Sequence, residues 1–201
     1  MNGMQVLVLL ANPRPGSFSH ALAQRTVATL TELGHRPVLL DLYDLGFDPI
    51  IKEGEAGRSA ELPTQVAEAV RHLTEADGIV VAHPNWWGMP PAILVGWIDR
   101  AIRVDSAYRF DGAEGEEGVP TGLLKARTAV VFNTSDTNTE RELATFGDPL
   151  ERIWRDCIFG FCGVTDVRRR TFGVMVTSTA DDRDRWLDEA EAMIREAYPA
   201  G

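Results

Sequence analysis

Two kinds of hydrophobic pattern alternate along this chain of 201 residues. Short unbroken apolar runs are typical of parallel strands buried on both faces, and apolar positions three or four residues apart are typical of amphipathic helices. The predicted strands cover 5–10, 37–42, 78–82, 128–132 and 164–176. The predicted helices cover 17–34, 63–74, 92–102, 150–161 and 181–198. This alternation predicts an α/β fold with a five-stranded, doubly wound parallel sheet and helices on both faces.

The length of the chain suits one sizeable core, so we expect a single domain that spans residues 1–201. In a doubly wound domain, ligands bind beyond the carboxyl ends of the strands, where the strand order reverses. The loops predicted at that edge are 11–18, 83–91 and 133–148. A further stretch, 111–122, contains four glycines and four acidic residues and is predicted to be a mobile surface loop.

Net charge narrows the range of partners. The formal charge is −10 and the sequence pI is about 4.9, so the surface would repel nucleic acids and anionic membranes. The apolar run 6–11 is much too short to cross a bilayer, and no basic leader precedes it. We therefore expect a cytoplasmic protein that binds a small molecule, with no nucleic-acid partner and no stable membrane insertion.

The cysteines and histidines give no sign of a metal site. Cys157 and Cys162 lie five apart within a predicted helix, which matches neither a disulfide framework nor a zinc motif, so both are predicted to be core thiols. The four histidines are scattered: His20, His35, His72 and His83. We expect His35 and His72 to be solvated and His83 to hydrogen-bond the backbone.

The first loop has the features of a phosphate site. It joins a buried strand to the start of a helix, where unpaired N–H groups and a partial positive charge attract anions. The hydroxyls of Ser17 and Ser19 would add donors, and His20 could touch the same phosphate. Neither G-x-G-x-x-G nor G-x-x-x-x-G-K-[ST] occurs, which disfavours dinucleotide dehydrogenases and P-loop enzymes. The alternative is that Ser17 only caps the helix.

The second loop carries two adjacent tryptophans, Trp86 and Trp87, between prolines. Large aromatic side chains on a rigid loop beside a ligand site are good walls for a planar ring, and Gly88 allows a close backbone approach. The alternative is that the indoles are core or interface anchors. The loop therefore indicates a flat, amphipathic ligand.

These motifs resemble the NAD(P)H:quinone oxidoreductase family of flavodoxin-like flavoproteins. The segments that carry the resemblance are Asn12-Pro13-Arg14, Ser17-Phe18-Ser19, Pro84 to Ala92, Gly96 to Arg100, and Phe146-Gly147-Asp148 through Phe161-Cys162-Gly163. The resemblance implies a flavodoxin-like fold, a homodimer, and ping-pong hydride transfer from NADH or NADPH through FMN or FAD to a quinone-type, azo or nitro acceptor. FMN is preferred over FAD, because the chain ends near the length of the compact bacterial members.

The resemblance also implies roles for individual residues. The flavin phosphate would be bound near Asn12 by Ser17, Phe18 and Ser19, and the ring would be lined by Pro84, Asn85, Trp86, Trp87 and Gly88. The third flavin loop would consist of Asn133, Thr134, Ser135 and Asp136. Tyr108 and Phe110 would line the substrate site of the partner subunit.

The sequence departs from the family in its third loop. Mammalian members place a tyrosine and a histidine beside the flavin, whereas 137–146 contains neither, and Phe146 stands where the histidine would be. Backbone N–H groups or the side chains of Thr134 and Ser135 would then stabilise charge on the reduced ring. No catalytic acid or base is assigned. The basic run 168–170 is predicted to be a solvated strand face, with contact to the 2′-phosphate of NADPH as the alternative.

Assembly and alternative functions complete the expectations. The stripe over 150–161 is wider than one sheet face needs, and Trp97 adds a further large aromatic, so a monomer would expose much apolar surface. The resemblance implies that these two helices meet their twofold mates, at an interface that includes Trp97 and Trp154. The alternative functions are an electron carrier of the flavodoxin type and a regulatory flavoprotein bound to a transporter.

Overall fold

Five parallel strands form the central sheet, in the order β2-β1-β3-β6-β7. The structure is a computed structural model and describes residues 3–55, 57, 60–111 and 118–200. The strands are Gln5–Leu10 (β1), Arg36–Asp41 (β2), Gly78–Pro84 (β3), Thr128–Thr134 (β6) and Asp166–Phe172 (β7). This order confirms the predicted doubly wound, flavodoxin-like sheet, whose strand order reverses between β1 and β3.

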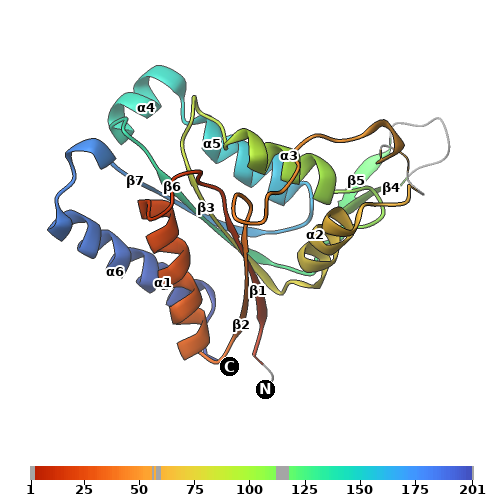
Figure 1. Cartoon of the computed structure of the whole chain (residues 1–201), viewed down its shortest axis with the longest axis horizontal. Coiled ribbons are helices and arrows are strands. Elements are labelled where there is room, and N and C mark those ends of the chain that lie inside the picture. The colour runs from red at the N-terminus through yellow and green to blue at the C-terminus, as the bar shows by residue number, and fades with distance from the viewer. Residues whose placement is uncertain (1–2, 56, 58–59, 112–117, 201) are drawn as a thin grey trace.

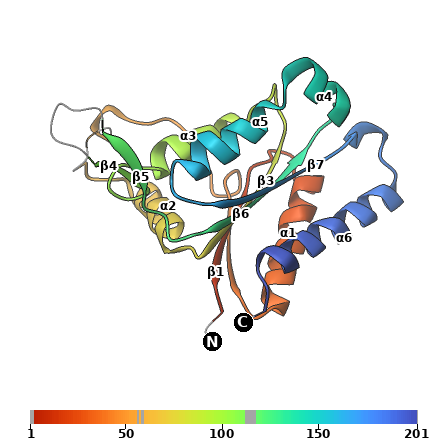
Figure 2. The same cartoon turned by 180° about the vertical axis from the view of Figure 1, so that it is seen from behind.

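Helices cover both faces of the sheet (Figures 1 and 2). One layer contains α1 and α6, and the other contains α2, α3, α5 and a π-helical segment, η2. The bounds are Phe18–Glu32 (α1), Thr64–Glu75 (α2), Ala92–Ala101 (α3), Thr139–Phe146 (α4), Pro149–Arg152 (α5), Ile153–Gly160 (η2) and Ala180–Ala197 (α6). Two short 3₁₀ turns are Glu53–Glu55 (η1) and Met175–Thr177 (η3).

The two-sided burial of the sheet explains its unbroken apolar runs. Successive side chains of a strand point to opposite faces. In β1, Val8 packs in the core beneath α1 and α6, and Leu9 packs in the core beneath α2, α3 and η2. All six residues of β1 are buried. Because neither face of such a strand contacts solvent, its sequence shows no alternation of polar and apolar residues.

Two of the strands extend further than their apolar runs predict. β3 and β6 each continue for two residues, and the pairing places His83 beside Asn133 and Pro84 beside Thr134. The polar side chains are tolerated because they bond each other inside the protein. β7, by contrast, is shorter than the predicted 164–176.

Two predicted loops contain regular structure. The sequence predicts a mobile surface loop over 111–122, but Tyr108–Asp111 (β4) and Val119–Gly122 (β5) pair as antiparallel strands. The part of this predicted loop that covers 112–117 lies outside the residues that the structure describes. The stretch 133–148 contains α4, none of whose residues is buried.

The predicted helix 150–161 has a different geometry. It begins as α5 and continues as η2, whose wider turns bring side chains five residues apart onto one side. Trp154 and Phe159 accordingly stack, with ring centroids 5.4 Å apart. Cys162 is buried as predicted, but Cys157 is exposed, because it lies on the outer side of η2. The prediction of a core thiol at Cys157 is therefore wrong.

His35 is also buried rather than solvated. Its Nδ1 accepts from the N–H of Met4 at 3.2 Å, and its Nε2 donates to the carbonyl of Tyr198 at 3.2 Å. The imidazole thereby joins the residue before β1 to the end of α6. Both of its ring nitrogens have a backbone hydrogen-bond partner, so the ring is tolerated inside the protein. In the part of the chain that the structure describes, no helix could span a membrane and no group of three His, Cys, Asp or Glu side chains could hold a metal.

Candidate functional site

A cavity of about 530 Å³ lies at the carboxyl ends of β1, β3 and β6. We call it the switch-point cavity. Its lining residues come from the loops after β1, β3, β6 and β7 and from α6: Asn12, Pro13, Arg14, Gly16, Ser17, Phe18, Pro84, Asn85, Trp86, Thr134, Ser135, Asp136, Thr137, Met175, Val176 and Arg183. Its volume is typical of small-molecule sites. The three loops chosen from the sequence therefore meet in one cavity.

The start of α1 offers free backbone donors to this cavity. Ser17 is the N-cap residue, but its hydroxyl bonds Nδ1 of His20 at 2.8 Å, and among the described residues no side chain caps the helix. The first turn carries no acidic residue. Gly16 precedes it with a positive φ of 70°, and a Cβ there would meet open space. The helix end is thus suited to an anion, and the structure favours this role over capping by Ser17.

Ser19 and Asn12 brace this loop from within. Ser19 is fully buried and does not line the cavity. Its hydroxyl accepts from the Asn12 amide at 3.1 Å, and the oxygen of the same amide accepts from the N–H of Arg14 at 3.0 Å. His20 also approaches Asp41, at 3.4 Å. The side chain open to direct contact with an anion is therefore that of Ser17, whereas Ser19 could offer only its backbone N–H.

The second loop is a tight turn with two left-handed residues. Trp86 and Met89 exchange backbone hydrogen bonds of 3.0 and 2.9 Å, and the residues between them, Trp87 and Gly88, have φ values of 58° and 74°. A non-glycine residue in this region is uncommon and is often found at functional sites. The Asn85 side chain holds the turn by accepting from the N–H of Gly88 at 2.9 Å.

The two tryptophans of this turn have different surroundings. Trp86 lines the switch-point cavity and is 43% exposed. Trp87 is fully exposed and borders a separate pocket. Neither indole is a core anchor, which removes the alternative interpretation of this loop as core.

The third loop is fixed by the segment that follows β7. The N–H of Ser135 donates to the carbonyl of Phe172 at 2.9 Å, and the carbonyl of Ser135 accepts from Met175 at 3.0 Å. The Asp136 carboxylate accepts from the N–H of Val176 at 2.8 Å. Thr134, Ser135 and Asp136 line the cavity, whereas Asn133 is buried behind it.

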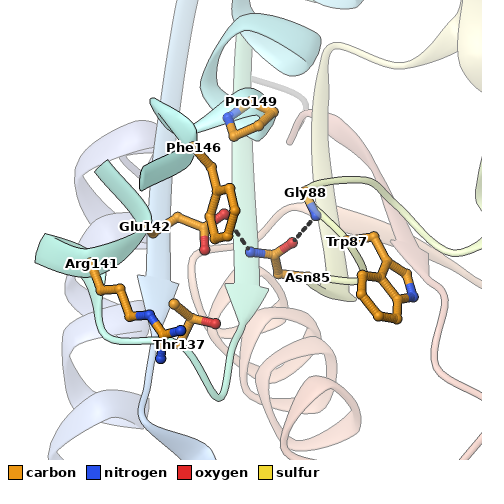
Figure 3. A pocket seen from close by; sticks show the side chains of 8 residues that line it. All are labelled: Asn85, Trp87, Gly88, Thr137, Arg141, Glu142, Phe146 and Pro149. Atoms are coloured by element: carbon orange, nitrogen blue, oxygen red, sulfur yellow. Dashed lines mark hydrogen bonds between the residues drawn. The ribbon is translucent and has the colours of Figure 1, made fainter. Parts of the chain in front are cut away.

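A second pocket, of about 320 Å³, lies between the tryptophan turn and α4 (Figure 3). We call it the α4 pocket. Its lining residues are Asn85, Trp87, Gly88, Thr137, Arg141, Glu142, Phe146 and Pro149. The Asn85 amide donates to Glu142 at 3.2 Å, so one side chain joins the turn to α4. Phe146 is 58% exposed and presents its ring to the pocket from the end of α4.

Several cavity residues were not predicted from the sequence. Arg141 and Glu142 were missed because α4 is only eight residues long and buries no apolar face, although its caps are visible in the sequence as Asn138 and Gly147. Arg183 reaches the switch-point cavity from α6, with its Nε bonded to the Ser178 hydroxyl at 2.9 Å. Only the three-dimensional packing of α6 against α1 brings Arg183 to this site.

Tyr108 and Phe110 lie away from both pockets. They belong to the β4–β5 hairpin and pack against Phe161, with ring centroids 4.8 and 6.2 Å apart. Neither lines the switch-point cavity of its own chain. The two side chains could therefore line a substrate site only in another subunit of an oligomer.

The indoles expected at an interface belong to the core of the chain. Trp97 and Trp154 are each only 2% exposed. Placing them at a twofold interface is therefore wrong. The same side of the molecule retains a hollow of about 340 Å³, which we call the α3–η2 hollow. Its lining residues are Ile98, Asp99, Ile102, Tyr108, Cys157, Ile158, Phe161 and Cys162.

The basic run 168–170 forms ion pairs within the chain. Arg168 pairs with Asp166 and Glu196, and Arg170 pairs with Glu189. Arg169, whose side chain is only 9% exposed, pairs with carboxylates at the start of α5. None of the three lines the switch-point cavity. The expectation of a solvated face is wrong for Arg169, because acidic partners on α5 cover it.

Comparison with known proteins agrees with this geometry. The family model described as a flavodoxin-like fold matches residues 4–197, so the chain belongs to that family.

Among its relatives is an uncharacterized NAD(P)H oxidoreductase of Haemophilus influenzae, 29% identical over 85% of this chain and 84% of the relative. The solved NAD(P)H:quinone oxidoreductase of Methanothermobacter marburgensis superposes with a TM-score of 0.82 and 27% identity, covering 96% of each chain. The fold is shared by an FMN-dependent NADH-azoreductase of Bacillus anthracis solved with FMN, at a TM-score of 0.77, 19% identity and coverage of 97% and 99%.

Proposed function

We propose that this protein is a flavin-dependent NAD(P)H oxidoreductase that passes two electrons to a quinone-type acceptor. The observation that carries the proposal is the switch-point cavity, which combines an uncapped helix start with a wall that includes Trp86. When bound there, the flavin supplies the redox chemistry by taking a hydride from NADH or NADPH and passing two electrons to the acceptor.

The donors around the start of α1 fit the phosphate of the flavin. Ser17 and the first N–H groups of the helix would bind it, and Arg14 and Arg183 line the same cavity and would balance its charge. Asn12 and Ser19 would act by holding the loop in shape. We propose FMN as the cofactor, because one phosphate matches one helix start.

The ring would lie against Pro84, Asn85 and Trp86. The third loop would face it with the hydroxyls of Thr134 and Ser135, since the Ser135 N–H is already donated to Phe172. The Ser135 hydroxyl oxygen accepts from the N–H of Thr137 at 3.0 Å, so its own proton is available to donate. Dipoles held in place in this way would stabilise negative charge on the reduced ring without a titrating residue.

The α4 pocket is the proposed site of the acceptor. Phe146 presents its ring to it and the fully exposed Trp87 lies at its border, which suits a flat molecule such as a quinone or an azo compound. Phe146 brings no proton to this site, so we assign no acid or base and expect protons to come from water. In a homodimer formed across the α3–η2 hollow, the partner's Tyr108 and the partner's Phe110 would complete the wall.

Steady-state kinetics tests this function. We expect the FMN-loaded protein to oxidise NADH or NADPH only when a quinone is present, with parallel lines in initial-rate plots, because donor and acceptor would use the site in turn. An electron carrier or a transporter-bound regulator would show no sustained turnover. Intersecting lines would contradict the alternating use of the site.

A further inference from the structure

His83 lies beneath the loops that form the switch-point cavity. It is the penultimate residue of β3 and is fully buried. Its Nδ1 is 2.7 Å from the carbonyl oxygen of Pro84, and its Nε2 is 2.8 Å from the amide nitrogen of Asn133 and 3.0 Å from the indole nitrogen of Trp154. The ring thus contacts groups from β3, β6 and η2.

The chemistry of these neighbours fixes the position of the imidazole proton. The Pro84 carbonyl can only accept, so Nδ1 must carry the proton and donate it. The Trp154 indole can only donate, so Nε2 must present its lone pair. A proton on Nε2 would face the donor hydrogens of Trp154 and Asn133. His83 is therefore neutral and in the Nδ1–H tautomer.

Arg169 fixes the orientation of the Asn133 amide. Its Nη1 donates to Oδ1 of Asn133 at 3.0 Å, which turns the NH₂ group of the amide toward His83. The guanidinium is itself held by Glu151 at 2.9 Å and by Asp148. The hydrogen bonds therefore run without a break from the start of α5 to the Pro84 carbonyl.

Burial agrees with this assignment. It lowers the pKa of His83 to about 4; the bond to the Pro84 carbonyl acts in the opposite direction, and the charge of Arg169 lowers the pKa further. The imidazole is thus neutral at physiological pH.

The network acts on one peptide group of the cavity wall. The carbonyl of the Pro84–Asn85 peptide accepts from His83, and its N–H donates to the carbonyl of Thr134 at 2.7 Å. Pro84, Asn85 and Thr134 all line the cavity. The peptide is thus held at both ends, and both of its anchors depend on the pairing of β3 with β6.

We propose that His83 is a positioning residue for the flavin ring, which as the Nδ1–H tautomer orients the Pro84–Asn85 peptide and ties the second and third loops together. This inference rests on the proposed function. His83 does not line the cavity, so it acts only through Pro84 and Asn133.

Two substitutions distinguish the hydrogen bond donated by Nδ1 from those accepted by Nε2. In His83→Asn, the short amide can reproduce the donor at Nδ1 but not the acceptor at Nε2. In His83→Gln, the longer amide can reproduce the acceptor but not the donor to Pro84. Trp154→Phe is a matched control, since it removes one donor to Nε2 and keeps an aromatic ring in the core.

Flavin titration of the folded variants tests the proposal. Because the Pro84 peptide is released, we expect His83→Gln to bind both FMN and riboflavin about tenfold more weakly, the equivalent of one lost hydrogen bond. The ratio of the two affinities should stay unchanged, because the phosphate loop is intact, and the visible bands of the bound flavin should shift. His83→Asn should remain closer to the wild type. A general loss of structure would not produce this pattern.

Nitrogen-15 NMR of the flavin-free wild-type protein supplies a second readout that needs no variant to fold. We expect a bonded proton on Nδ1 and a proton-free Nε2. A proton on Nε2, or a His83→Gln protein that binds FMN with wild-type affinity and spectrum, would overturn the role of His83 alone. If the wild-type protein binds no flavin, the proposed function fails as well.

Discussion

Asn85 and Glu142 are joined by a 3.2 Å hydrogen bond although 57 residues separate them in the sequence. The other end of the Asn85 amide accepts from the N–H of Gly88 at 2.9 Å. One side chain therefore ties the strained Trp87 turn to α4 (Figure 3). Because the two elements form opposite walls of the α4 pocket, the width of the pocket depends on this contact.

The first prediction concerns Glu142. In Glu142→Ala the Asn85 amide loses its acceptor, so we expect a higher KM for the quinone with little change in the dissociation constant for FMN. Unfolding free energy should fall by only about 0.5 kcal/mol, because water can replace the acceptor in a half-exposed position. Glu142→Gln keeps an acceptor oxygen and should behave like the wild type. Equal kinetics in all three proteins would contradict the role of this contact.

The second prediction separates Ser17 from Ser19. Ser17→Ala should weaken FMN binding by about 1–2 kcal/mol, the value of a hydrogen bond to a charged group, and should leave riboflavin binding unchanged. Ser19→Ala should instead lower stability, because it removes the partner of the Asn12 amide inside the protein. The comparison of FMN with riboflavin is made by fluorescence titration. Equal losses for both ligands in Ser17→Ala would exclude a phosphate contact.

The third prediction tests the proposed homodimer with a substitution at an exposed position, where it should not disturb the fold of the monomer. Cys157 is exposed and lines the α3–η2 hollow, so Cys157→Glu should fold normally but place a charge twice in a twofold interface. Light scattering should give about twice the 22.2 kDa chain mass for the wild type and for the control Cys157→Ser, and the chain mass for Cys157→Glu. A wild-type protein that is monomeric and fully active would exclude the shared site.

The fourth prediction follows from the low pKa of His83, about 4 in the folded protein against an ordinary value of 6.5. Between these two values the unfolded chain binds a proton that the folded chain does not, so stability is complete above pH 6.5 and falls as the pH falls toward 4. The loss amounts to about 3 kcal/mol. In urea unfolding across this range, the gap in stability between the wild type and His83→Gln should narrow by that amount. Parallel curves would show that His83 has the same pKa in the folded and the unfolded chain, which would contradict the assignment.

The sequence predicts the sheet and the three loops of the cavity because both have strong local signals. The apolar runs of β1, β3 and β6 are long and continuous, and a helix start with Ser17 or a pair of tryptophans is visible without a structure. Their meeting in one cavity follows from parallel topology, in which the carboxyl ends of neighbouring strands share an edge.

The features that could not be predicted from the sequence leave only a weak or non-local pattern in it. α4 is only eight residues long and none of them is buried, so hydrophobic periodicity gives no clear signal for it. The π geometry of η2 matches a stripe that is also compatible with an α-helix, and only the stacking of Trp154 on Phe159 distinguishes the two. The bonds of His83 to Asn133 and Trp154 span 50 and 71 residues, and no local pattern records them.

The most direct test of the central claim is the visible absorbance of the purified protein mixed with FMN under anaerobic conditions. The account predicts that the flavin bands shift on binding, bleach when NADH or NADPH is added, and return when a quinone follows. Bands identical to those of free FMN, or a bound flavin that neither nicotinamide bleaches, would contradict it.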